Sequence, residues 1–402
     1  MNIVFFGLVL VSVVAAAFGE PGTMAAVGKA ALDGAKSSVE LAISLAGAMT
    51  LFLGLMKVLE AAGGLDVLAR MIRPVMVRLF PDVPADHPAM GAMILNIAAN
   101  VLGLGNAATP FGIKAMQELN ALNKTQGTAT NAMVLFLAIN TSGVAVLPSG
   151  VIAMRASLGA ATPASIFVPT IAASVINTVV AVLAAKLFSR FSPVPQGDVP
   201  RTPDRLLDFV PVVLFSAAFG ALVATVYVYG EVATAWIIPG LILGLLTVGV
   251  FGRVKVYETF IEGARDGFQS AIRIIPYLVA ILTAVGMFRA SGVMDRVIGL
   301  FGPIVRLVGM PPEVLPLAFL RPLSGSGAFA LTGEITKTYG PDSFIAQVAG
   351  TMQGTTETTF YVLAVYFGAV GISKTRHAVA TGLMSDVSGV LAAVWACHVL
   401  LG

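Results

Sequence analysis

Residues 89–119 read AMGAMILNIAANVLGLGNAATPFGIKAMQEL, an apolar stretch that glycine, asparagine, threonine and proline interrupt in its middle. Soluble helices rarely tolerate such breaks. Membrane helices do, because neighbouring helices and cavities satisfy the backbone groups that a break exposes. Stretches of the same kind lie at 131–155, 314–337 and 344–370. The pattern indicates a polytopic membrane protein built from broken helices.

The composition of the whole chain agrees with this interpretation. Of the 402 residues, 57% are hydrophobic and 11% are charged, whereas a soluble domain carries roughly 25% charged residues. High hydrophobicity with low charge also excludes a disordered chain. The net charge of +3 gives no indication of a nucleic-acid partner.

Residues that carry enzyme chemistry are sparse. The single cysteine, Cys397, lies in the last apolar run, and the three histidines, His87, His377 and His398, share no metal-ligand spacing. The chain has no phosphate-binding loop, dinucleotide fingerprint, His-Glu-x-x-His motif or nucleophile elbow. We therefore expect no enzyme activity, no metal site and no cofactor.

The two halves of the chain resemble each other. A shift of 229 residues aligns Gly34-Ala35-Lys36 with Gly263-Ala264-Arg265, Gly63 with Gly292 and Pro74 with Pro303. Shifts of 221 and 209 residues align later positions in the same order. Collinear matches of glycine, proline and charged residues predict an internal repeat.

Each repeat contains the same parts in the same order. The expected parts are a first helix at 2–18 or 236–252, a long apolar helix at 39–59 or 268–288, a short arm at 65–80 or 294–308, the two broken stretches, and a final helix at 164–188 or 379–400. The arm is charged and too short to cross the ~30 Å hydrocarbon core. We expect it to lie at the interface as an amphipathic helix bent at Pro74 or Pro303.

We therefore predict an all-α, polytopic integral membrane protein. Two homologous helical repeats of about five transmembrane segments each, with broken or re-entrant helices, are joined by one connector helix. The first unit covers 1–192, a linker with the connector helix at 209–229 covers 193–231, and the second unit covers 232–402.

Basic residues predict the orientation in a bacterial cytoplasmic membrane. If every broken stretch crosses fully, Lys29, Lys36, Lys186, Arg190 and Arg253 all lie inside, the N-terminus lies outside, the C-terminus lies inside, and both units face the same way. If one broken stretch of each unit is a re-entrant hairpin, five spans become four and the units are inverted instead.

Polar side chains gather at the breaks, where we expect a substrate or an ion to bind. The candidates are Asn96, Asn100, Asn106, Thr109, Asn140, Ser142 and Asn177 in the first unit, and Arg321, Ser324, Ser326, Gln353, Thr355, Glu357 and Asp386 in the second. For the neutral residues the alternative is helix packing or bonding to the local backbone. For the charged residues the alternative is mutual pairing.

The two units differ chemically at aligned positions. Asn100 aligns with Arg321, and Asn177 aligns with Asp386. The first unit thus offers neutral amides where the second offers charges. A pocket between them would suit a small hydrophilic solute.

Several motifs resemble known membrane families. Leu79-Phe-Pro-Asp-Val-Pro-Ala-Asp-His-Pro-Ala-Met-Gly91 and Gly103-Leu-Gly-Asn-Ala-Ala-Thr-Pro-Phe-Gly-Ile-Lys-Ala-Met116 resemble the spore maturation protein A family. Ile274-Ile-Pro-Tyr-Leu-Val279, Phe288-Arg-Ala-Ser-Gly292, Pro316-Leu-Ala-Phe-Leu-Arg-Pro322 and Tyr361-Val-Leu-Ala-Val-Tyr-Phe-Gly-Ala-Val-Gly-Ile372 resemble the spore maturation protein B family. The resemblance implies a fused form of the two, with nucleoside recognition (Gate) domains and a role in spore maturation and dehydration. It supplies no established substrate and no binding residue that can be transferred.

Two functions follow as hypotheses. The first is a secondary transporter or permease for a small polar solute, nucleoside-like or a carboxylate, coupled to a proton or Na⁺. The alternative is a non-transporting membrane scaffold in envelope or spore cortex assembly. The lipid bilayer is the expected partner in both, and a homo-oligomer is left open.

Overall fold

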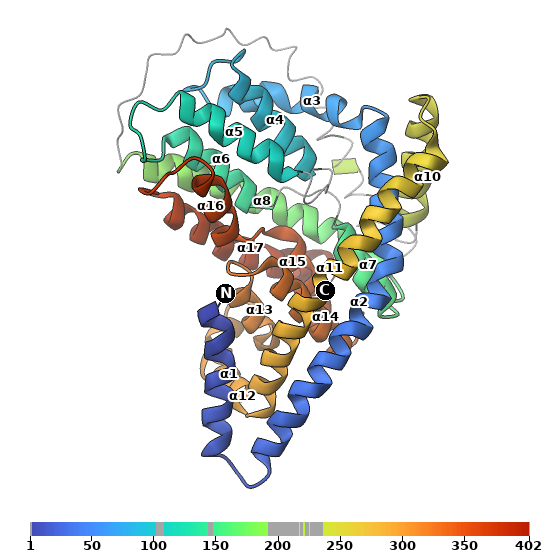
Figure 1. Cartoon of the computed structure of the whole chain (residues 1–402), viewed down its shortest axis with the longest axis vertical. Helices are drawn as coiled ribbons and strands as arrows, with labels where there is room; N and C mark the ends of the chain where they lie inside the picture. Colours follow the sequence, from blue (N-terminus) through green and yellow to red (C-terminus); the bar gives the residue numbers. More distant parts are fainter. Residues whose placement is uncertain are drawn as a thin grey trace.

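The computed structural model describes residues 2–101, 108–143, 148–191 and 236–401, together with the isolated positions 217, 220, 221 and 225. These residues form helices and, among them, no β-sheet (Figure 1). The helices of the first unit are α1 (Asn2–Ala17), α2 (Thr23–Ala61), α3 (Gly64–Leu79), α4 (Pro88–Val101), α5 (Ala108–Ala121), α6 (Asn131–Thr141), α7 (Ser149–Ser157) and α8 (Phe167–Ser189). Most of the connector helix expected at 209–229 and the break at 102–107 lie outside the described residues.

The second unit repeats this order. Its helices are α10 (Ile237–Phe251), α11 (Val256–Ala290), α12 (Val293–Arg306), α13 (Leu315–Leu320), α14 (Gly325–Tyr339), α15 (Phe344–Thr355), α16 (Thr359–Gly368) and α17 (Ala378–Leu400). Each helix from α10 to α17 thus has a counterpart from α1 to α8. The breaks predicted in the apolar stretches are confirmed after the end of α6, between α13 and α14, and between α15 and α16.

Helices α2 and α11, which occupy equivalent positions in the two units, pack along each other in opposite directions (Figure 1). Gly54 near the end of α2 lies against Phe260 near the start of α11, whereas Gly34 near the start of α2 lies against Leu282. A Cβ atom on Gly34 would come within 2.8 Å of the Leu282 carbonyl oxygen. Glycine at this position therefore lets two helix backbones approach closely, as in other membrane helix pairs.

Helices α8 and α17 form a second antiparallel pair. Ala173 near the start of α8 shares a hydrophobic cluster with Ala392 and Ala396 near the end of α17. Ala185 near the end of α8 shares another cluster with Ala378 at the start of α17. Exchanging the two units therefore places each of these helices on an equivalent helix that runs in the opposite direction.

This reversal decides how the units face each other. A two-fold axis that reverses helices crossing a membrane cannot run along the membrane normal, so it lies close to the membrane plane. The units are therefore inverted. The interpretation in which both units face the same way is wrong, and the alternative with a re-entrant hairpin fits the structure.

Helices α4 and α5 form the hairpin of the first unit. They pack against each other, and each has 14 residues, or about 21 Å at 1.5 Å per residue, which is short of the ~30 Å hydrocarbon core. The segment from α13 to α14 is its counterpart in the second unit. Among the described helices, three are individually long and apolar enough to cross a membrane, at Thr23–Ala61, Pro163–Ser189 and Ala378–Leu400.

The arms α3 and α12 begin at equivalent glycines. Gly63 and Gly292 both have positive φ angles, of 79° and 73°, a conformation that glycine adopts at little cost. The chain turns by 80° between Leu278–Ala290 and Val293–Arg306. The sharp bend thus lies at Gly292, before the arm, and α12 continues through Pro303 as α3 does through Pro74.

The two ends of the antiparallel pair α2–α11 define two opposite faces of the molecule. On the first face, Lys57 at the end of α2 pairs with Glu262 at the start of α11, at 3.7 Å. On the second face, Arg289 at the end of α11 pairs with Glu334 of α14, at 3.0 Å. Lys29 and Lys36, at the start of α2, therefore lie on the second face, whereas Arg253 follows Gly252, which lies against Ala62 at the end of α2 on the first face. The prediction that all these basic residues share one side is wrong.

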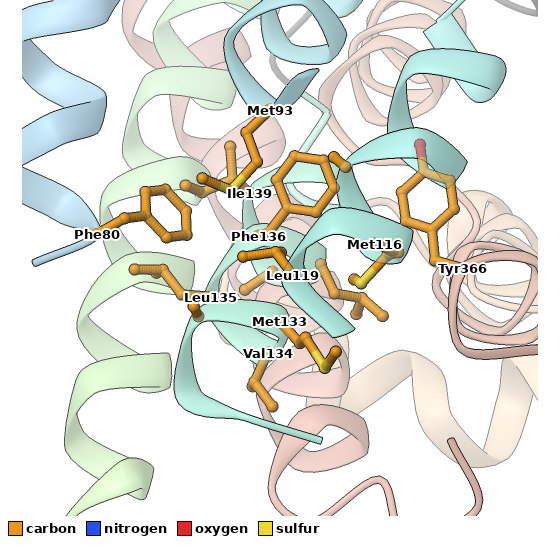
Figure 2. Close-up of a cluster of buried hydrophobic side chains, with 14 of the residues drawn as sticks. Phe80, Met93, Met116, Leu119, Met133, Val134, Leu135, Phe136, Ile139 and Tyr366 are labelled. Atoms are coloured by element: carbon orange, nitrogen blue, oxygen red, sulfur yellow. The ribbon is translucent and has the colours of Figure 1, made fainter. Parts of the chain in front are cut away.

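The hydrophobic core mixes side chains of the two units. Figure 2 shows Tyr366 of α16, from the second unit, beside Met116 of α5 and Phe136 of α6, from the first unit. The rings of Phe136 and Tyr366 are stacked, with centroids 6.0 Å apart. The two units thus complete each other's core.

Candidate functional site

The broken helices of the two units meet at the centre of the molecule. The N–H group of Glu357, in the break between α15 and α16, donates to the carbonyl oxygen of Thr141, at the end of α6, at 2.9 Å. A Cβ atom on Gly143, whose φ is +64°, would lie 2.9 Å from Cα of Thr356. We call residues 140–143 and 353–359 the crossing, because one broken helix passes directly over the other there.

Asn177 of α8 holds the two breaks together. Its amide nitrogen donates to the carbonyl oxygens of Ser142 and Thr355, at 3.1 and 3.4 Å. Its amide oxygen accepts from the hydroxyl groups of Ser385 and Ser388 of α17, at 3.1 and 2.6 Å. Both ends of the amide are therefore satisfied, which favours the packing interpretation for Asn177.

Arg321 makes hydrogen bonds at the buried carboxyl end of α15. From the turn between α13 and α14, its guanidinium donates to the Thr358 hydroxyl at 3.1 Å and to the carbonyl oxygens of Gln353, at 3.2 Å, and Thr356. The carboxyl end of a helix carries partial negative charge and unsatisfied carbonyl groups, so a buried cation is stabilised there. The main partners of Arg321 are thus backbone carbonyls.

Glu357 contributes less to this arrangement than its charge suggests. Its carboxylate lies 3.8 Å from the Arg321 guanidinium, and its side chain is 54% exposed, against 5% for Arg321. Arg321 and Glu357 therefore form an ion pair, but it is a weak one because the Glu357 carboxylate is half exposed to solvent. Arg321 is buried at the crossing, whereas the Glu357 side chain is exposed.

Asp386 of α17 is the acid buried at the crossing. One carboxylate oxygen accepts from the Thr359 hydroxyl at 3.0 Å. The other is buried and has no hydrogen-bond partner within the described part of the chain. Three further polar atoms at the crossing share this condition: Nε of Arg321, Oε1 of Gln353 and Oγ1 of Thr356. Buried polar groups are costly when unpaired. The hydroxyl groups of Thr170 and Ser174 on α8 are also buried without a described partner, and Thr170 lies against Gly354.

The first unit offers a cluster of amides in place of charges. Asn100 donates to Asn140 at 2.9 Å, and Asn96 donates to the hydroxyl group of Tyr366 at 3.2 Å. The same hydroxyl group donates to Asn140 at 3.3 Å. Gly112 leaves the space that the hydroxyl group occupies. These groups join the hairpin of the first unit to helices α6 and α16.

The sequence pattern does not indicate Tyr366 and Ser388 as site residues. Tyr366 lies in an apolar helix, where an aromatic residue usually indicates packing. Ser388 lies two residues from the predicted Asp386, in an apolar helix where a serine usually indicates packing or a bond to the local backbone. Only their positions opposite Asn140 and Asn177 reveal their roles.

Three of the remaining candidates bond to backbone groups of their own helices. Ser324 accepts from the Gly327 N–H group and caps α14, while Ser142 and Thr355 donate to carbonyl oxygens of their own helices. Thr109 and Ser326 are half-buried in the first turns of α5 and α14. Asn106 lies outside the described residues. Within the described ranges, no three His, Cys, Asp or Glu side chains come close enough to hold a metal ion.

Two proteins of Bacillus subtilis (strain 168) are similar to this chain. Spore maturation protein B is 47% identical over 165 residues, which are 41% of this chain and 93% of that protein. Spore maturation protein A is 41% identical over 188 residues, which are 47% of this chain and 95% of that protein. Each protein matches about half of the chain, as in a fusion of the two.

A family described as nucleoside recognition, Gate, matches residues 42–158 and 271–373. The matched segments begin 229 residues apart, which is the shift that aligns the two repeats. They include the breaks of both units, and Asn177 and Asp386 follow them. Together they cover more than half of the chain. The chain therefore belongs to the nucleoside recognition (Gate) family.

Proposed function

We propose that the protein is a secondary transporter for a small polar solute that binds at the crossing. The observation that carries this proposal is the set of four buried, unpartnered polar atoms on Arg321, Gln353, Thr356 and Asp386, within the part of the chain that the structure describes. Breaks that expose backbone groups between inverted repeats are the recurrent architecture of solute sites in secondary carriers. A solute that pairs with these atoms would recover the cost of burying them.

The solute is nucleoside-like or a carboxylate. Arg321 offers an unpaired N–H group to a carboxylate or a ring carbonyl, and Gln353 offers an amide oxygen to a ring N–H or a hydroxyl group. The family description, nucleoside recognition, supports the first of these two classes.

Asp386 is the site for a coupling proton or Na⁺. A carboxylate with one unpaired buried oxygen and a hydroxyl group beside it can accept either cation. The residue that aligns with it, Asn177, carries no charge and has all its partners. We therefore assign ion coupling to the second unit alone.

The biological setting is the cytoplasmic membrane of a spore-forming bacterium. The names of both relatives connect them to spore maturation. We extend that connection to this chain, with transport of the solute across the membrane as its contribution. We propose no enzyme activity. The proposed transport function holds for a single chain or for a homo-oligomer.

Basic residues lie at both faces of the α2–α11 pair. Lys57 and Arg253 lie at the first face, whereas Lys29, Lys36 and Arg289 lie at the second. Basic residues favour the cytoplasmic side. Because the basic residues lie at both faces, we keep the orientation predicted from the sequence as the proposal, with the N-terminus outside and the C-terminus inside. A reporter fused after Gly402 that is active only outside the cell should be silent, and an active fusion would contradict this.

Uptake into proteoliposomes tests the transport function. The full chain is reconstituted and offered labelled nucleosides, dicarboxylates and amino acids, with and without proton and Na⁺ gradients. We expect gradient-dependent uptake of one class, and loss of that uptake in Asp386→Asn. A folded protein that moves none of these solutes under any gradient would favour the membrane scaffold instead.

A further inference from the structure

A charged cavity lies away from the crossing, on the second face of the molecule. It has a volume of about 530 Å³ and lies between the start of α2, the end of α11 and the end of α14. Its polar lining consists of Asp33, Ser37, Arg289, Glu334, Lys337 and Thr338. We call it the vestibule. Its volume is within the range of small-molecule sites.

The vestibule is separate from the crossing. Helix α14 starts at Gly325, which lies against Thr358 of the crossing, and reaches the vestibule at Glu334. Nine residues of helix correspond to about 14 Å. A solute in the vestibule therefore does not contact Arg321 or Asp386, and its binding can be measured without reference to transport.

The charges of the vestibule are balanced and incompletely paired. Two acids, Asp33 and Glu334, and two bases, Arg289 and Lys337, line it. One Glu334 oxygen pairs with Arg289 at 3.0 Å, and the other is buried with no partner among the described residues. A purely structural bridge between α11 and α14 would account for the first oxygen only. The second oxygen requires a donor, which a bound solute can supply.

The corresponding hairpin helix of the first unit lacks this arrangement. On α5, Lys114 pairs with Glu118 one turn away, at 2.6 Å, within a single helix. The Lys114 side chain is 60% exposed, and that of Glu118 is 21% exposed. Neither oxygen of Glu118 is among the buried, unpartnered atoms of the described residues. Glu118 is therefore a matched control for Glu334.

We propose that the vestibule binds a zwitterionic solute of the amino acid or short peptide class. Its ammonium group donates to the free oxygen of Glu334, with Asp33 as a second acid nearby. Its carboxylate accepts from Lys337 and from the N–H groups of Arg289 that Glu334 does not use. A purely anionic or purely cationic solute leaves one pair of like charges uncompensated, so a solute with both charges is preferred.

Equilibrium binding to the purified full chain in lipid nanodiscs tests this proposal. Three probes of nearly equal size are titrated by calorimetry: alanyl-alanine, N-acetyl-alanyl-alanine, which lacks the positive charge, and alanyl-alanine amide, which lacks the negative charge. We expect alanyl-alanine to bind at least tenfold more tightly than either capped form. Equal binding of the three probes, or no binding of alanyl-alanine, would overturn the proposal.

Variants separate the vestibule from the crossing. Glu334→Gln and Lys337→Gln should each weaken alanyl-alanine binding at least tenfold, whereas Glu118→Gln should leave it unchanged. Asp386→Asn should abolish uptake and leave this binding intact, so a failure of the transport proposal does not imitate a failure of this one. Because either vestibule variant alone could disturb folding, size-exclusion profiles are compared for both. Folded Glu334→Gln and Lys337→Gln proteins with wild-type affinity would contradict the proposal.

Discussion

Asn177 and Asp386 occupy aligned positions in the two units and illustrate two uses of one place in the fold. The amide of Asn177 makes four hydrogen bonds and joins both breaks to α17. The carboxylate of Asp386 makes one hydrogen bond, to Thr359, and keeps one oxygen buried without a described partner. The same position is therefore fully hydrogen-bonded in one unit and keeps one unpartnered oxygen, among the described residues, in the other. Satisfaction of hydrogen bonds, more than residue type, separates the two roles.

The breaks of the two units also differ in how their polar side chains are hydrogen-bonded. In the first unit, Asn100 from the hairpin reaches Asn140 of the broken helix, and the amides satisfy one another. In the second unit, Arg321 from the equivalent turn reaches the end of α15 and retains an Nε atom with no partner among the described residues. The amides of the first break thus pair with each other, while the arginine of the second break keeps one nitrogen unpaired within the described residues. Four substitutions test this division.

The largest effect on stability is expected for Arg321→Gln. The substitution leaves the carbonyl groups of Gln353 and Thr356 without their donor and Asp386 without the nearby positive charge. Breaking a buried charged contact of this kind costs about 3–5 kcal/mol. Chemical unfolding in detergent should show the loss, and Arg73→Gln, which removes an exposed pair with Asp86, should change the midpoint little. Equal midpoints for the two variants would mean that Arg321 does not stabilise the crossing.

A smaller loss of stability is expected for Asn177→Leu. The leucine side chain has a similar volume but removes the partner of the Ser142 and Thr355 carbonyl groups and of the Ser385 hydroxyl group, while Ser388 keeps its bond to the Ser385 carbonyl oxygen. Unsatisfied buried groups cost about 1–3 kcal/mol each, and local rearrangement recovers part of this, so we expect a total loss of about 2 kcal/mol. The measurement is again the unfolding midpoint. An Asn177→Leu variant as stable as wild type would remove the structural assignment of Asn177.

Asp386→Asn should reduce function without reducing stability. Asparagine keeps the shape and the bond to Thr359 and removes a buried charge, which is costly within a membrane. Solute uptake should be lost while the unfolding midpoint stays the same or rises. Asp86→Asn, at a side chain that is 90% exposed, should keep both properties. Normal uptake by the Asp386→Asn variant would show that ion coupling lies elsewhere.

The smallest effect is expected for Glu357→Gln. Because the Glu357 side chain is 54% exposed and lies 3.8 Å from Arg321, its pairing contributes within the range of about 0–1 kcal/mol that exposed pairs show. The Arg321→Gln/Glu357→Gln double variant should therefore be as unstable as Arg321→Gln alone. A double variant restored close to wild-type stability would show that the two charges form the dominant pair after all.

Much of the helical framework follows from the sequence. Apolar runs interrupted by glycine and polar residues predict the broken helices, and the aligned positions predict the repeat, because these signals are local or depend on order along the chain. The alignment of Asn100 with Arg321 and of Asn177 with Asp386 also comes from the sequence. Composition alone indicates the membrane.

The roles of the site residues required the tertiary structure. Tyr366 and Ser388 join the polar networks through partners more than 200 residues away, and no spacing within α16 or α17 indicates such contacts. Glu357 shows the opposite case, since a charge within an apolar stretch suggests a central role that its exposure does not support. The sharp bend lies at Gly292 and depends on its positive φ angle. The sequence instead suggests a bend at Pro303, through which α12 continues.

The sequence by itself determined that this protein is an all-helical membrane protein made of two repeats with polar breaks. Only the tertiary structure decided that the repeats are inverted, which groups meet at the crossing, and that a charged vestibule lies on one face. The physical reason is that hydrophobic periodicity and residue order act within each segment, whereas helix direction and hydrogen-bond satisfaction depend on which segments pack together. The close approach of α2 and α11 at Gly34, and of the two breaks at Gly143, is a property of that packing.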